Sequence, residues 1–212
     1  MEYESGSKNF PLWIMSDIEP SYLEAKLDGP FDYRHPVRHI VCTSILNVIQ
    51  YYVYQYENRR LAEENIYFRT TISENAEKPK INDVIWPGEV MEDVEKIKSD
   101  INRYQPAVIL SFGAFTYEIL RRTDTNNTNR SYGSWTPEEL GGEFKACLNE
   151  FDIHQSNIFP LMDRSIIGWK FLQSHEQFVG QKNADYFKFA GKKIAGILNK
   201  YRDELDIWTK PT

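Results

Sequence analysis

Hydrophobic runs of two kinds alternate along the chain. Short apolar runs rich in β-branched and aromatic residues predict strands, and longer segments with apolar residues every three or four positions predict helices. We expect strands at 11–15, 66–72, 107–113 and 157–161, and helices at 36–60, 87–103, 114–122, 137–150 and 183–204. The segments 123–133 and 162–182 show neither period and are expected to be irregular. This alternation predicts an α/β fold, a three-layer α/β/α sandwich with a central, mainly parallel sheet.

The polar residues that follow the predicted strands are the first places to look for a site. The chain has 212 residues, with neither a repeat nor a low-complexity tract, so we expect one domain over residues 1–212. In open α/β sheets, ligands bind outside the carboxyl ends of the strands. The segments at those ends are expected to share one rim; they are 17–22, 70–74, 111–115 and 160–165.

Composition narrows the choice of partners. The formal net charge of −6 opposes the binding of a polyanion such as nucleic acid. We interpret Arg121, Arg122 and Arg130 as solvated surface charges. The two cysteines, Cys42 and Cys147, lie in helical patterns. We interpret them as small buried hydrophobic residues of a protein in a reducing compartment. The acidic N-terminus does not resemble a signal peptide, and no apolar stretch has the length of a membrane span. We therefore expect a cytoplasmic protein without a membrane partner.

Two carboxylates after the first predicted strand are the leading catalytic candidates. The apolar run that ends at Met15 is followed by Asp17 and Glu19, and Pro20 keeps Glu19 out of the helical region. Glu19 is either a general base near an attacking water or an ordinary turn or capping residue. Asp17 competes for the same role. The two carboxylates point the same way on an extended segment, so they could also share a proton or bind a metal.

Two further residues suit a flat ligand with a developing negative charge. Phe31 follows Gly29-Pro30 and either stacks on a base or fills the core beneath its loop. His175, in the late irregular segment, either reaches the rim and stabilises an anion or is polar surface. The four histidines lack metal-ligand spacing, and the Walker, GxGxxG, GxSxG and HExxH motifs are absent. We expect neither a metal nor a cofactor.

Three segments follow one another in a characteristic order: Asp17-Ile18-Glu19-Pro20, Gly29-Pro30-Phe31, and a buried strand from Pro106 to Gly113 with the pattern Pro-x-Val-Ile-Leu-x-x-Gly. This order resembles the uracil-DNA glycosylase superfamily over nearly the whole chain. The resemblance implies that fold, with an acid before proline that positions water and an aromatic residue that stacks on the base. Asp17 stands where the family has its first glycine, and Thr70 stands where an asparagine reads the base edge. The late loop of the family, with its histidine, corresponds either to Pro160–Ser165 or to Ser174-His175-Glu176.

The resemblance leads to three alternative functions. In the first, the protein hydrolyses the N-glycosidic bond of a flipped base in DNA: Glu19 orients water, Phe31 stacks, and His175 or Arg164 stabilises the departing base. In the second, the same scaffold is an inactive module that binds a nucleotide or a protein. In the third, it hydrolyses a free nucleoside or nucleotide, which suits the acidic charge.

Overall fold

A mostly parallel five-stranded sheet forms the centre of the chain. The computed structural model describes residues 4–17, 43–62, 65–73, 75–163 and 169–207. The strand order is β1-β3-β2-β4-β5, and β1 alone runs antiparallel, against β3. The strands are β1 (Glu4–Ser5), β2 (Leu12–Ser16), β3 (Ile66–Thr70), β4 (Val108–Phe112) and β5 (Asn157–Leu161). The predicted α/β class and mainly parallel sheet are confirmed.

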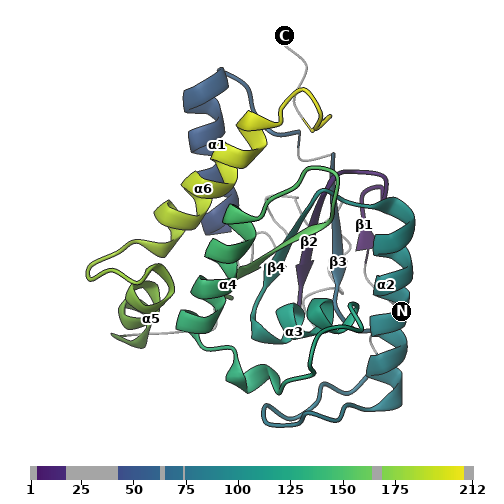
Figure 1. Cartoon of the computed structure of the whole chain (residues 1–212). Coiled ribbons are helices and arrows are strands. Elements are labelled where there is room, and N and C mark those ends of the chain that lie inside the picture. Colours follow the sequence, from purple (N-terminus) through teal and green to yellow (C-terminus); the bar gives the residue numbers. More distant parts are fainter. Residues whose placement is uncertain (1–3, 18–42, 63–64, 74, 164–168, 208–212) are drawn as a thin grey trace.

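Helices cover both faces of this sheet (Figure 1). They are α1 (Thr43–Glu57), α2 (Gly88–Tyr104), α3 (Ala114–Arg122), α4 (Pro137–Asn149), α5 (Trp169–Val179) and α6 (Tyr186–Lys200), with a 3₁₀ turn η4 (Tyr132–Ser134). Because side chains alternate along a strand, Leu12 and Ile14 of β2 pack with α1, α4 and α6, whereas Trp13 and Met15 pack with α2 and α3. This arrangement is compatible with a three-layer sandwich.

Most predicted elements have observed counterparts, with one clear error. The predicted start of α4 is confirmed: Pro137 follows the N-cap Thr136, whose Oγ1 accepts a hydrogen bond from the backbone N–H of Glu139 at 3.3 Å. The segment 162–182 was expected to be irregular, but it contains α5. Polar Ser174 and His175 lie on the buried side of α5, and this interrupts the apolar period that would have revealed a helix. The antiparallel β1 has only two residues, too few for any pattern.

The carboxyl ends of the four parallel strands are level with one another. Ser16 pairs with Thr70 on one side and Phe112 on the other, and Phe112 pairs with Leu161. The expected rim is therefore confirmed for the described residues; in Figure 1 it is the end of the sheet beside α3. From β2 the chain passes to β3 on one side, then returns through α2 to β4 on the other. The boundary between β2 and β4 is thus the point where strand order reverses. Ligands usually bind at this point in such sheets, outside the carboxyl ends of the strands.

Candidate functional site

Four segments meet at the rim beside the β2–β4 switch point. Asp17, directly after β2, accepts a hydrogen bond and ion pair from Lys78, which lies in the loop after β3. The Lys78 Nζ also lies 4.8 Å from the ring centroid of Phe115 in α3 and 5.3 Å from that of Tyr132 in η4. A cation over an aromatic face is attracted by the ring quadrupole. We refer to Asp17, Lys78, Phe115 and Tyr132 as the Lys78 cluster.

Local geometry brings the aromatic side of this cluster to the rim. Gly113 directly follows β4 and is the N-cap of α3. Its φ is +92°, a conformation that a residue with a side chain rarely adopts. Phe115 in the first turn of α3 then packs against Trp86 and Tyr132, with ring centroids 5.4 and 5.2 Å away. Tyr132 donates a hydrogen bond from its hydroxyl to the backbone oxygen of Pro79 at 3.1 Å. The residue next to Lys78 is therefore anchored.

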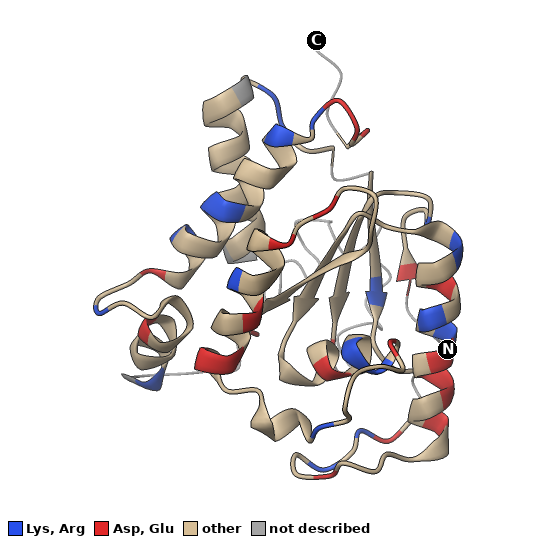
Figure 2. Cartoon of the chain, viewed as in Figure 1, with Lys and Arg blue, Asp and Glu red and all other residues tan. Residues whose placement is uncertain are grey.

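A buried carboxylate braces the loops around the cluster. Glu118 of α3 is fully buried and accepts hydrogen bonds from Arg122 Nε at 3.0 Å, the Arg130 backbone N–H at 2.9 Å and Trp135 Nε1 at 2.8 Å. Arg122 in turn donates to the backbone oxygen of Val84 at 2.9 Å. The interpretation of Arg122 as a solvated surface charge was therefore wrong, because this guanidinium joins α3 to both loops. Figure 2 shows acidic (red) and basic (blue) positions interspersed along the ribbon of these loops.

The site residues that the sequence suggested do not all lie together at the rim. Asp17 lies at the rim, as its position after a strand suggested. Thr70 lies at the end of β3 but is buried, and its hydroxyl donates to the backbone oxygen of Ile72 at 3.3 Å, so it is engaged in its own turn. Glu19, Phe31 and Arg164 lie outside the described residues.

The expected loop position of His175 was wrong. This residue lies in α5 and is only 5% exposed, with its ring 4.1 Å from that of Phe171 and 5.2 Å from that of Phe187. Its Nδ1 accepts a hydrogen bond from the Tyr186 backbone N–H at 3.4 Å, and burial lowers its pKa. The neighbouring Tyr186, whose ring lies 5.6 Å from that of His175, accepts a hydrogen bond from the Met162 N–H at 2.9 Å through its hydroxyl. His175 is thus packed among aromatic rings of α5 and α6.

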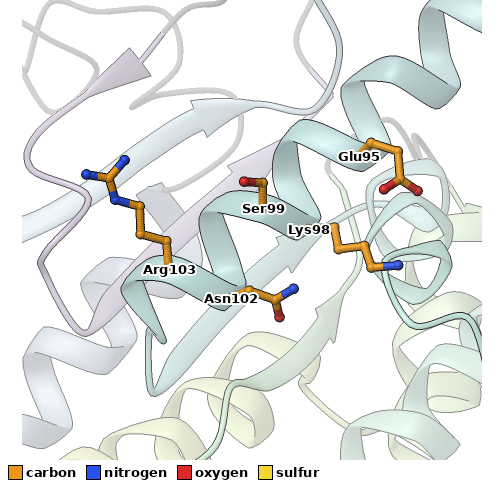
Figure 3. Close-up of a pocket in the computed structure, with 5 residues that line it drawn as sticks. All are labelled: Glu95, Lys98, Ser99, Asn102 and Arg103. Atoms are coloured by element: carbon orange, nitrogen blue, oxygen red, sulfur yellow. The ribbon is translucent and has the colours of Figure 1, made fainter.

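A pocket of about 470 Å³ lies elsewhere, on α2 (Figure 3). Its lining residues all come from that one helix: Glu95, Lys98, Ser99, Asn102 and Arg103. Because α2 runs back from the rim, this end of it lies near the amino ends of the strands, where Lys8 pairs with Asp100 at 2.9 Å.

The metal and thiol candidates add little to the site. Among the residues that the structure describes, no group of three or more His, Cys, Asp or Glu side chains is arranged to hold a metal ion. Cys147 is half-buried in α4, and burial raises the pKa of its thiol to about 12. Cys42 lies outside the described residues.

The comparisons with known proteins leave the site to be judged on its geometry. No protein-family model matches the chain, and no curated protein matches it either. Among the helices described here, none is long and apolar enough to cross a membrane.

Lys78, Phe115 and Tyr132 were missed as site residues, since Lys78 is 61 positions from Asp17 and lies in an ordinary polar loop. The available signal was weak: Phe115 lies at the predicted rim, two positions after the glycine that follows a strand.

Proposed function

We propose that the rim binds a nucleobase-containing ligand and hydrolyses its N-glycosidic bond, as a divergent protein with a uracil-DNA glycosylase-like fold. The observation that supports this most is the position of Asp17, at the carboxyl end of the central strand and paired with Lys78, whose ammonium lies over the rings of Phe115 and Tyr132. Carboxylates at such a position can orient water, and aromatic rings favour flat ligands.

The proposed reaction assigns distinct tasks to the residues after β2. Glu19 or Asp17 orients a water molecule toward the sugar carbon, and Phe31 stacks on the flipped base. Bond breakage leaves negative charge on the departing base, and a nearby donor or cation lowers the energy of that state. In this proposal Arg164 supplies the charge, since His175 is buried among aromatic rings.

A second candidate is a module on the same scaffold that binds a nucleotide without hydrolysing it. Two observations favour it: Asp17 is already engaged by Lys78, and the Thr70 hydroxyl bonds to its own turn. A threonine also lacks the paired donor and acceptor of an amide, so it cannot read a base edge as asparagine does.

The test is cleavage of a labelled single-stranded oligonucleotide that contains one uracil, followed by alkali. We expect strand scission by the wild type and a loss of about 100-fold in Glu19→Gln or Asp17→Asn, the usual contribution of a general base. Phe31→Ala should also lose activity. The control is Glu95→Gln, which removes an exposed carboxylate on α2, far from the rim.

Two results would contradict hydrolysis at this rim. The first is no scission by folded wild-type protein, which leaves the binding module to be tested with nucleotides. The second is scission that all three rim variants retain at the level of Glu95→Gln, because the reaction would then occur elsewhere.

A further inference from the structure

We infer that Lys78 is a phosphate-binding residue of this rim, which contacts the phosphate of a nucleotide ligand. This rests on the proposed function only in that the ligand is a nucleotide; it requires no hydrolysis. A lysine ammonium is a compact point charge with three donors, and lysine is a common ligand of phosphate groups.

The first argument is that Lys78 is held in place and yet accessible. Asp17 and the two rings fix its Nζ, while its side chain is 41% exposed. An exposed lysine usually loses considerable rotamer entropy when it binds a ligand. Here much of that freedom is already lost, so binding an anion costs less. Asp17 accepts one donor of the ammonium, which leaves further donors for an oxygen of the ligand.

The second argument is that the loop that carries Lys78 is anchored to η4 at two points. The Tyr132 hydroxyl donates to the oxygen of Pro79, and the Gly133 N–H donates to the oxygen of Ile81 at 2.9 Å. Backbone bonds to the neighbouring residues hold the loop against η4 at the rim. A mobile surface lysine would need none of this support.

The third argument decides which part of the ligand Lys78 meets. Within the cluster Phe115 is almost fully buried, as is Trp86, which packs against it, whereas Lys78 lies at the solvent-facing side. The phosphate of a nucleotide is strongly hydrated and stays near solvent, and its base is the part that enters an apolar pocket. Lys78 is therefore placed for the phosphate and not for the base.

The experiment compares binding of deoxyuridine monophosphate and deoxyuridine by isothermal titration calorimetry. Lys78→Met removes the charge but keeps an unbranched side chain, and Lys78→Arg keeps the charge. Lys80→Met is the matched control, because it removes the same charge from an exposed residue two positions along the same loop. We expect Lys78→Met to weaken binding of the monophosphate about tenfold, the effect of losing a charged hydrogen bond. Deoxyuridine binding should be unchanged in all variants, and Lys78→Arg should keep most of the affinity.

A second readout uses the carboxylate partner. Asp17→Asn removes a negative charge beside the ammonium, so it should tighten binding of the monophosphate while it lowers any hydrolysis about 100-fold. A structural role for Lys78 predicts the opposite, since the loss of Asp17 would then loosen the cluster and weaken binding. Circular dichroism and thermal melts of each variant establish that it is folded.

The outcomes separate this inference from the proposed reaction. Selective loss of monophosphate affinity in Lys78→Met supports the inference, even when the protein hydrolyses nothing. Equal losses in Lys78→Met and Lys80→Met, or equal losses for nucleoside and monophosphate, overturn it and leave the proposed hydrolysis standing. A wild type that binds neither compound but cleaves the oligonucleotide also overturns it, and one that neither binds nor cleaves overturns both.

Discussion

Replacing Glu118 by glutamine tests the brace behind the Lys78 cluster. The carboxylate of Glu118 is fully buried, and the Arg122 side chain that it binds is 2% exposed. Burial lowers the pKa of Arg122 and the charge of Glu118 opposes this, so the pair is needed to keep a guanidinium in the interior. Glutamine keeps the shape and one oxygen but loses the charge, and its amide NH₂ faces either the donors of Arg122 and Arg130 or the donor of Trp135.

The expected loss is large because one charge stays buried. Breaking a buried ion pair by removing one partner costs about 3–5 kcal/mol. The oxygens of Val84 and Arg130 still accept from Arg122, so we expect the lower end, about 3 kcal/mol. That is a considerable part of the roughly 5–15 kcal/mol that keeps a domain folded. The control is Glu139→Gln, which breaks the exposed pair with Arg130 and should cost at most about 1 kcal/mol.

Urea denaturation followed by tryptophan fluorescence measures both losses. Trp135 bonds to Glu118 and Trp86 stacks on Arg122, so the fluorescence reports the region that changes. The midpoint of Glu118→Gln should fall while the dependence on denaturant stays the same. A loss no larger than that of Glu139→Gln would refute the reasoning, because Glu118 would then contribute no more than a surface carboxylate.

Two further predictions concern packing and pH. Gly141→Ala should destabilise the protein, because a Cβ there would lie 2.0 Å from the Phe178 backbone oxygen of α5, whereas Gly142→Ala, with nothing within 4 Å, should stabilise α4 by about 0.5–1 kcal/mol. Thermal melts that shift both variants in the same direction would contradict this geometry. Burial lowers the pKa of His175 from its ordinary 6.5, so the unfolded chain binds more protons and stability should fall as pH drops through that value. The midpoint of His175→Phe should depend less on pH than that of the wild type between about pH 7 and pH 5, whereas His154→Gln, at an exposed residue, should behave as the wild type does.

The strands were predictable because their environment is simple. β2, β3 and β4 are buried on both faces, so each begins in the sequence with at least three consecutive apolar residues. α5 was not predictable in the same way, since its buried face includes Ser174 and His175. Ser174 satisfies its hydroxyl on the backbone oxygen of Lys170 at 2.7 Å, and His175 accepts from Tyr186. Polar groups that find partners inside the fold remove the hydrophobic period without removing the helix.

The site was predictable only where it lies at the end of a strand. Asp17 follows β2, so its place at the rim comes from topology alone. Lys78 depends on how two loops pack, which the local sequence does not encode. Arg122 had a usable signal, since it lies four positions after Glu118 in an apolar helix, a spacing at which opposite charges meet. Whether such a pair faces solvent or the core depends on the loops that cover it.

The buried Glu118–Arg122 pair and the Lys78 cluster are connected through these loops. Glu118 touches no member of the Lys78 cluster in any bond described above, yet it holds the Arg130 backbone two residues before Tyr132. Tyr132 in turn holds Pro79, next to Lys78. A chain of part-buried hydrogen bonds therefore leads from a carboxylate in α3 to the residue next to an exposed ammonium at the rim. Because buried polar groups cost free energy when they lack partners, this chain has one well-satisfied arrangement, and that arrangement places the ammonium beside Asp17.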